Sequence, residues 1–248
     1  MTARHMRRYF TIVACVLSVF AALAPAQEKD RPSDPLKKPL YTSKGPGTLL
    51  FQNIAKVNLP EGCLYLDGAD PRVLVKRLQD PLIGGDLGSV IGENCTAVFQ
   101  FDPIGYVNDN EKDRLDPAFL MNIIKKESAK GIQPIHIKGW HKKPCYDETT
   151  HTLEWIIAGK RDGEEILNVN TCILGRQGVM RITLITTQAT ITQDLPIYRE
   201  WLKGFSYMPG QQYEAYRSGD KVAKYGLRDI VAGNGVIAMA KSHISESL

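Results

Sequence analysis

The chain has 248 residues, a formal net charge of +4, 43% hydrophobic residues and five cysteines. This length accommodates one ordinary domain with targeting and linker segments, and it leaves little room for a second full domain. Three arginines near the N-terminus, which no acid balances, supply most of the positive charge, so the remainder carries only +1. A near-neutral chain excludes an electrostatic argument for nucleic-acid binding.

Residues 1–26 have the three parts of a secretory signal peptide. The arginines precede an apolar run over 9–23, and Ala24-Pro25-Ala26 forms a small-residue cleavage site. An uncleaved membrane anchor is one alternative, because the apolar run approaches the roughly 17–25 residues of a membrane span. A lipoprotein attached at Cys15 is another, although the apolar stretch before it is short. The sequence thus predicts a secreted or periplasmic protein of the bacterial cell envelope.

Residues 27–47 read as a flexible linker, because prolines, glycines and charges leave few apolar side chains to bury. The folded domain is expected over residues 48–228. Short strands are predicted at 48–51, 54–57 and 63–66, on either side of turn residues. A helix is predicted from Asp70-Pro71 to Gln79, where aspartate caps and proline suits the first position.

The next elements follow the same logic. A glycine-rich loop is predicted at 84–88 and an alternating strand at 96–101. Asp116-Pro117 predicts a second capped helix, which runs to Lys130 and ends at Gly131.

The best-defined predicted structure is a meander of strands from Ile135 to Thr187, with a break at Lys143-Pro144. Its alternation is clearest at Met180, Ile182 and Leu184, which indicates that one face of the sheet is core. Gly175 to Gly178 predict a hairpin turn in which glycine tolerates positive φ.

A helix from about Thr192 to Lys203 is expected to cover the sheet with Leu195, Ile197, Trp201 and Leu202. Residues 229–248 are predicted to be a weakly apolar tail. The fold class is therefore α+β, an antiparallel meander sheet with flanking helices.

Five blocks of sequence resemble the bacterial DUF2167 family, in matching order over roughly residues 48–240. These blocks are residues 105–107, 136–140, 144–155, 174–179 and 220–227. The family is described as membrane-anchored proteins with a secretion signal and an apolar C-terminal segment, and it implies no activity. In this chain the apolar stretch from Ile230 to Ala240 is about half a membrane span. A soluble periplasmic protein, or one held in the membrane by an uncleaved leader, is therefore favoured over anchoring through this tail. The order of strands and helices also looks distantly like the Mog1/PsbP type, as a fold-level analogy.

Reactive side chains are densest in the centre of the meander. The predicted binding residues are Trp140, His141, Tyr146, Asp147 and His151, which we expect to lie on a turn from Trp140 to His151. Asp147 also fits ordinary turn chemistry. His136 and His151 could face each other across adjacent strands as zinc ligands, but the spacing matches no zinc pattern and no metal site is predicted. No Walker loop or nucleophile elbow occurs, so no catalytic residue and no cofactor is predicted.

Four cysteines remain after the leader: Cys63, Cys95, Cys145 and Cys172. In an oxidising compartment an even count favours disulfides, and the pairs Cys63–Cys95 and Cys145–Cys172 are the expected ones. Four free thiols are the equally weighted alternative.

Two functions remain open from the sequence. The first is a non-catalytic envelope module that binds a protein or a small envelope ligand. The second is a periplasmic hydrolase or metal-dependent enzyme that uses His136, His141 or His151. Histidines that converge with carboxylates in a cleft would favour the enzyme, and dispersed histidines would favour the binding module.

Overall fold

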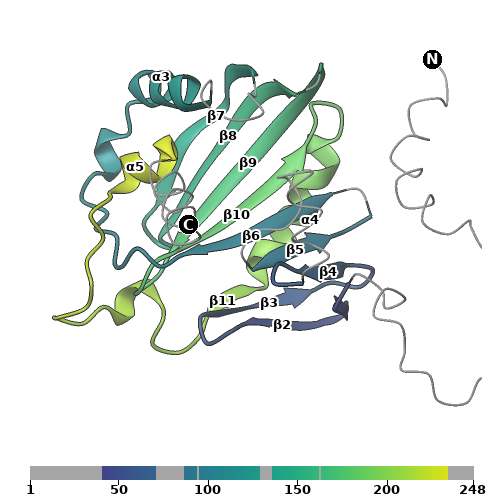
Figure 1. Cartoon of the computed structure of the whole chain (residues 1–248), viewed down its shortest axis with the longest axis horizontal. Helices are drawn as coiled ribbons and strands as arrows, with labels where there is room; N and C mark the ends of the chain where they lie inside the picture. Colours follow the sequence, from purple (N-terminus) through teal and green to yellow (C-terminus); the bar gives the residue numbers. More distant parts are fainter. Residues whose placement is uncertain (1–40, 71–86, 94, 129–135, 162, 234–248) are drawn as a thin grey trace, which may run out of the picture. The chain divides into compact units, whose positions relative to one another are not determined.

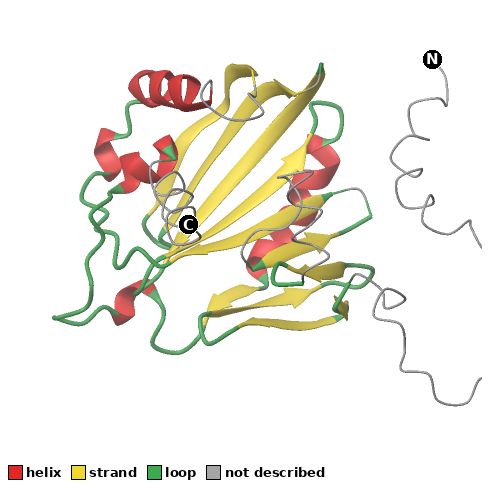
Figure 2. Ribbon diagram, viewed as in Figure 1, coloured by secondary structure: helices red, strands yellow, loops and turns green. Residues whose placement is uncertain are grey.

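The computed structural model describes residues 41–70, 87–93, 95–128, 136–161 and 163–233. All of them belong to one compact unit, Pro39–Leu248. Their strands form two antiparallel sheets, and helices pack on both faces of the larger one (Figures 1 and 2). The predicted α+β class is confirmed.

The larger sheet has eight strands in the order β1-β4-β5-β6-β10-β9-β8-β7. The strands are β1 (Ser43–Lys44), β4 (Leu64–Asp67), β5 (Gly88–Ile91), β6 (Thr96–Asp102), β7 (His136–Asp147), β8 (Thr152–Arg161), β9 (Glu164–Leu174) and β10 (Val179–Thr186). The last four are the predicted meander. It continues into the rest of the sheet because β10 also pairs with β6.

The smaller sheet has the order β11-β3-β2 and consists of β2 (Gly47–Phe51), β3 (Ala55–Leu59) and β11 (Phe205–Tyr207). Ordered structure begins earlier than the expected Thr48, since Ser43 and Lys44 pair with Tyr65 and Leu64 of β4. The segment predicted as a linker therefore contains a strand near its end.

The described helices are α3 (Pro117–Ser128), α4 (Ile191–Lys203) and α5 (Leu227–Ala232), with 3-10 turns η2 (Lys112–Arg114) and η3 (Tyr213–Ala215). Asp116 caps α3 as predicted, because its Oδ1 accepts from the backbone N–H of Ala118 at 2.9 Å. The expected helix end at Gly131, the helix predicted after Asp70 and the first residues of the 84–88 loop lie outside the described residues.

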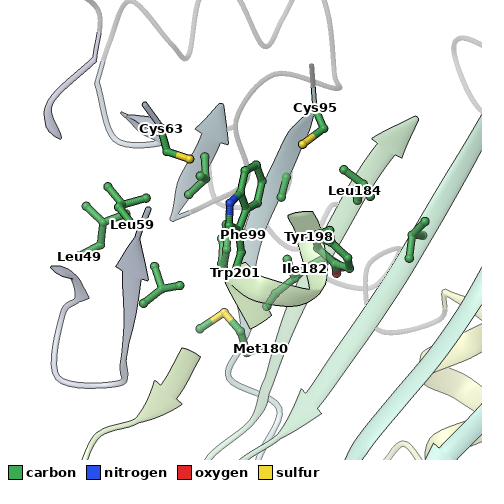
Figure 3. Packing of buried hydrophobic residues seen from close by; sticks show 14 of the residues in the cluster. Leu49, Leu59, Cys63, Cys95, Phe99, Met180, Ile182, Leu184, Tyr198 and Trp201 are labelled. Atoms are coloured by element: carbon green, nitrogen blue, oxygen red, sulfur yellow. The ribbon is translucent and has the colours of Figure 1, made fainter. Parts of the chain in front are cut away.

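The first core lies between the larger sheet, the smaller sheet and α4 (Figure 3). Met180, Ile182 and Leu184 point into it, as their alternation predicts. On α4, Tyr198 and Trp201 are buried. Ile197, expected to help cover the sheet, is instead 41% exposed, because it lies at the edge of the buried face, about 100° around the helix from Tyr198.

The second core covers part of the opposite face of the sheet, and it contains Leu153 and Trp155 of β8 together with residues of α3 and α5. Leu227 and Ile230 of α5 are buried in it. The folded part therefore extends through Ala232, past the boundary expected at residue 228. The residues placed at the start of a tail are helical because this second core gives them a surface to pack on.

The expected break at Lys143-Pro144 does not occur. β7 runs through both residues, with register shifts against β8 near Lys142 and Cys145. β7 is the outer strand of the sheet, where a proline without an N–H is tolerated.

The 175–178 turn is confirmed, but neither glycine has a positive φ. Close approach explains them instead. A Cβ on Gly178 would lie 2.1 Å from the Asp102 carbonyl oxygen, and one on Gly175 would lie 2.6 Å from Cζ of Tyr207.

Gly178→Ala is expected to lower the free energy of unfolding by about 1–3 kcal/mol, because backbone has to move to admit the methyl group. Gly139→Ala is the matched control, since nothing lies within 4 Å of its Cβ position. Urea unfolding measures both variants. Equal stabilities for the two would show that the close approach at Gly178 has no energetic consequence.

Candidate functional site

The structure brings together only two of the five predicted binding residues, Tyr146 and His151. Trp140 is a packing residue, since its ring N–H donates to the Pro117 carbonyl at 2.9 Å and ties β7 to α3. His141 is exposed on β7. Asp147 closes the turn, because its Oδ1 accepts from the backbone N–H and the hydroxyl of Thr149 at 2.9 and 2.7 Å. The turn spans residues 148–151, so Trp140 lies within the strand and not on the turn as expected.

Tyr146 and His151 do come together. The Tyr146 hydroxyl lies 3.0 Å from Nδ1 of His151 and donates to Oδ2 of Asp109, also at 3.0 Å. On the other side of the imidazole, Nε2 lies 3.3 Å from Oε1 of Glu214. When the ring is protonated, both of its N–H groups therefore have acceptors.

A stack of rings extends from this histidine. His151 lies on Tyr213 with 4.0 Å between ring centroids. Tyr213 stacks on Tyr106 at 4.5 Å, and Tyr106 contacts Tyr216 at 4.3 Å. We call Tyr106, Tyr146, His151, Tyr213 and Tyr216 the tyrosine–histidine cluster.

Tyr146 and Tyr213 of the cluster hold their protons. Burial raises the pKa of Tyr146, and the hydrogen bond to the Asp109 carboxylate raises it further. Burial likewise raises the pKa of Tyr213, whose hydroxyl donates to the Val107 carbonyl at 2.9 Å. Both hydroxyls are therefore neutral hydrogen-bond donors and not phenolate nucleophiles.

Segments far apart in sequence build this end of the sheet. The Gly105 N–H donates to Gln177, and the N–H of Tyr106 donates to Lys221. Gly105 has φ of +100°, and a Cβ there would lie 2.5 Å from the Lys221 carbonyl oxygen. The β6 exit, the 175–178 turn and the 217–223 segment thus fix the position of Tyr106. Four of the five blocks that resemble the family contribute to this end.

Arg176 and Asp220 clamp two of these segments. Nε and Nη2 of Arg176 donate to the two carboxylate oxygens of Asp220 at 2.7 and 2.8 Å. The guanidinium, helped by the backbone N–H of Arg217, lowers the pKa of Asp220 to about 2.

The clamp predicts an acid-dependent stability difference. A depressed folded-state pKa stabilises above the unfolded value, near 3.8, and this stabilisation is lost as pH falls toward 2. The wild-type protein is expected to exceed Arg176→Ala in stability by a constant amount above about pH 4.5, and by a shrinking amount below it. Urea unfolding from pH 5 to 2 measures the difference, and a gap independent of pH would contradict the assignment.

The three histidines of the enzyme alternative do not converge. His136 pairs with Lys160 at one end of the β7–β8 hairpin, whereas Asp147, near His151, pairs with Thr152 at the other. His136 and His151 therefore do not face each other, because they lie at opposite ends of the β7–β8 hairpin. Within the described residues, no three His, Cys, Asp or Glu side chains form a group that could hold a metal ion.

All four cysteines of the folded part are free thiols, so the two predicted disulfides are wrong. Cys145 is exposed and pairs with Glu154, whereas Cys172 lies beyond β8 in the second core. Cys63 and Cys95 lie in the first core with the Trp201 ring between them (Figure 3).

The thiols are expected to differ in reactivity. Burial raises the pKa of Cys95 to about 12 and that of Cys172 to about 11, so few thiolates form there. In the unreduced mature protein, a thiol reagent is expected to modify Cys145 in the native state. It should modify Cys63, Cys95 and Cys172 only after unfolding. Fewer than four reactive thiols in denaturant would contradict the free-thiol structure.

Sequence reasoning missed most partners of His151. Tyr106 lies within one of the blocks that resemble the family, but no sequence signal assigns it a role in a site. Asp109, Tyr213, Glu214 and Tyr216 carried no local signal, since the contacts that gather them cross long stretches of chain. The Tyr146–Asp109 hydrogen bond alone spans 37 residues.

A family model described as "Protein of unknown function (DUF2167)" matches residues 43–243. The chain belongs to this family. The match covers every described strand and helix of the DUF2167 domain. A comparison with curated proteins finds no match.

Two solved structures are similar to this DUF2167 protein. Cyanobacterial PsbP (CyanoP) from Synechocystis sp. PCC 6803 has 9% identity and a TM-score of 0.40, over 62% of this chain and 86% of that one. LpqN, described as involved in cell envelope biogenesis of Mycobacterium tuberculosis, has 10% identity and a TM-score of 0.35, over 69% and 90%. Among the described helices, none has the length and apolarity required to cross a membrane.

Proposed function

We propose that this DUF2167 protein is a non-catalytic binding module of the bacterial cell envelope, and that the tyrosine–histidine cluster is its contact surface for an envelope protein. The N-terminal sequence supports an extracytoplasmic location, in the periplasm or at the membrane. The observation that carries the proposal is the ring stack from His151 to Tyr216, flanked by the carboxylates of Asp109 and Glu214.

The cluster is only partly covered by the rest of the chain. Tyr216, at the end of the stack, is 39% exposed, and the Glu214 side chain is 68% exposed. Partly exposed aromatic rings with fixed hydroxyls combine apolar area with a polar group, which is why tyrosine is enriched at binding hot spots. Three separate segments hold these rings in place, so little entropy is lost when a partner docks.

A protein fits this surface better than a small ligand does. The rings cover one another's faces, so a flat molecule has no slot between them. Their outer edges and the exposed carboxylate can pack against a complementary protein surface. The partner would present a basic side chain to Glu214.

Hydrolysis is less well supported by the same contacts. His151 contacts Tyr146, Asp109, Glu214 and Tyr213. Within the part of the chain that the structure describes, none of its hydrogen-bond or ion-pair partners is a serine, threonine or cysteine that it could activate as a nucleophile.

The test is capture from a crosslinked envelope fraction of the source bacterium, with tagged wild-type protein and two variants. Tyr216→Ala removes the exposed end of the stack. Tyr41→Ala removes an equally exposed tyrosine, also 39%, outside the cluster. We expect one protein to be enriched by the wild type and by Tyr41→Ala, and to be reduced at least about tenfold by Tyr216→Ala.

Equal enrichment by all three proteins would move the contact surface away from the cluster. No enriched protein, together with a small molecule that co-purifies with the wild type and not with Tyr216→Ala, would replace the protein partner by a ligand. No enrichment of either kind would remove the support for a binding module.

A further inference from the structure

A pocket of about 230 Å³ lies between α3 and α5, apart from the tyrosine–histidine cluster. Its apolar wall consists of Phe119, Leu120 and Ile123 from α3 and Ala232 from α5. Pockets for drug-sized ligands measure roughly 300–1,000 Å³, so this one suits a smaller molecule.

Two opposite charges line the same pocket, and each has a buried atom without a partner. Oε2 of Glu111 and Nε of Arg228 are inaccessible to solvent and make no hydrogen bond. Within the described residues, no ion pair joins either side chain to the other or to a third residue. A buried polar atom without a hydrogen-bond partner costs free energy, so each of these two atoms calls for an explanation.

Each side chain packs closely on a neighbour. A Cβ on Gly226 would lie 2.4 Å from Oε2 of Glu111, so a glycine is required for the carboxylate to approach the chain there. The Arg228 guanidinium lies over the Phe119 ring, 4.9 Å from its centroid. The remaining acid of the pocket, Asp229, already accepts from the Gly226 N–H at 3.2 Å. Glu111 is therefore the carboxylate left for a ligand.

We propose that this pocket binds a small zwitterion with an apolar side chain, of the size of a free α-amino acid. The ligand carboxylate pairs with Arg228, its ammonium pairs with Glu111, and its side chain packs on Phe119, Leu120 and Ile123. A ligand with a single charge would leave one of the two side chains without a counter-charge. A peptide terminus has only one of the two charges, which favours the free amino acid.

Calorimetric titration with L-phenylalanine tests the proposal on the wild-type protein. We expect binding in the millimolar range or tighter. We also expect at least about tenfold weaker binding of 3-phenylpropanoate, which lacks the ammonium, and of 2-phenylethylamine, which lacks the carboxylate. No heat from phenylalanine, or equal affinity for either analogue, would overturn the proposal.

Two variants assign the charges. Glu111→Gln and Arg228→Gln are each expected to weaken phenylalanine binding at least about tenfold. Arg114→Gln, at an exposed arginine in η2, is the matched control and is expected to bind as the wild type does. Thermal melting confirms that each variant is folded. Wild-type affinity in both folded pocket variants would overturn the proposal, and the analogue series decides it on the wild type if a variant does not fold. The tyrosine–histidine cluster shares no residue with this pocket, so either proposal can fail without the other.

Discussion

Arg181→Met is expected to lower the free energy of unfolding by about 3–5 kcal/mol, because it leaves the Asp102 carboxylate buried without its counter-charge. Nη2 of Arg181 donates to Oδ2 of Asp102 at 2.7 Å, and the two side chains are only 8% and 5% exposed. Arg181 lies on β10 and Asp102 on β6, so the pair joins two central strands of the larger sheet. Urea unfolding at neutral pH measures the loss.

Two further variants separate the loss of the pair from general damage to the surface. Lys203→Met breaks the exposed Lys203–Glu200 pair on α4 and is expected to cost less than about 0.5 kcal/mol. Adding Asp102→Leu to Arg181→Met removes the stranded carboxylate and is expected to restore most of the stability. A loss below about 1 kcal/mol for Arg181→Met alone would show that the buried carboxylate finds another partner or a proton.

Trp201→Ala is expected to lower the free energy of unfolding by about 3–5 kcal/mol, because it leaves a cavity at the centre of the first core. Trp201 is 2% exposed and lies with Tyr198 among residues of both sheets (Figure 3). The indole also contacts Gly92, where a Cβ would lie 2.9 Å from the ring. This contact holds the hairpin between β5 and β6 against α4.

Ile197→Ala on the same helix is the control. Because Ile197 is exposed, its truncation is expected to change stability by less than about 0.5 kcal/mol. Chemical unfolding of both variants measures the two effects. Far-UV circular dichroism follows the transition, because Trp201→Ala changes the tryptophan fluorescence. Similar losses at the two positions would mean that α4 does not pack on the sheet by the face that contains Trp201.

The meander and the capped helix could be predicted because their signals are local. Alternation at Met180, Ile182 and Leu184 determines a face, and Asp116 followed by proline determines a helix start. Alternation also marked Arg181 as facing away from the first core, but it could not show that Arg181 would be buried. Arg181 is buried because segments of the second core, which come from remote parts of the chain, cover the opposite face of the sheet.

The candidate site was predictable only in part, for a similar reason. Tyr146, at the end of β7, and His151, in the turn that follows, lie five residues apart, so local reasoning placed both at one site. Tyr213 reaches the same place through contacts such as its hydrogen bond to Val107, which spans 106 residues. The prediction of disulfides was wrong because an even number of cysteines does not show which side chains lie between them. Trp201 and strand β8 each separate one expected pair.

The outer strand β7 has a consequence for the behaviour of many copies of the molecule. The free edge of a sheet exposes N–H and C=O groups on which a second chain can continue the hydrogen-bond ladder and seed aggregation. On β7, Pro144 lacks an N–H, register shifts interrupt the regular spacing, and the exposed Lys143 adds a positive charge. Each of these features opposes the docking of another strand. The residues that made β7 look like a broken strand in sequence therefore protect the molecule from polymerising through this edge of the sheet.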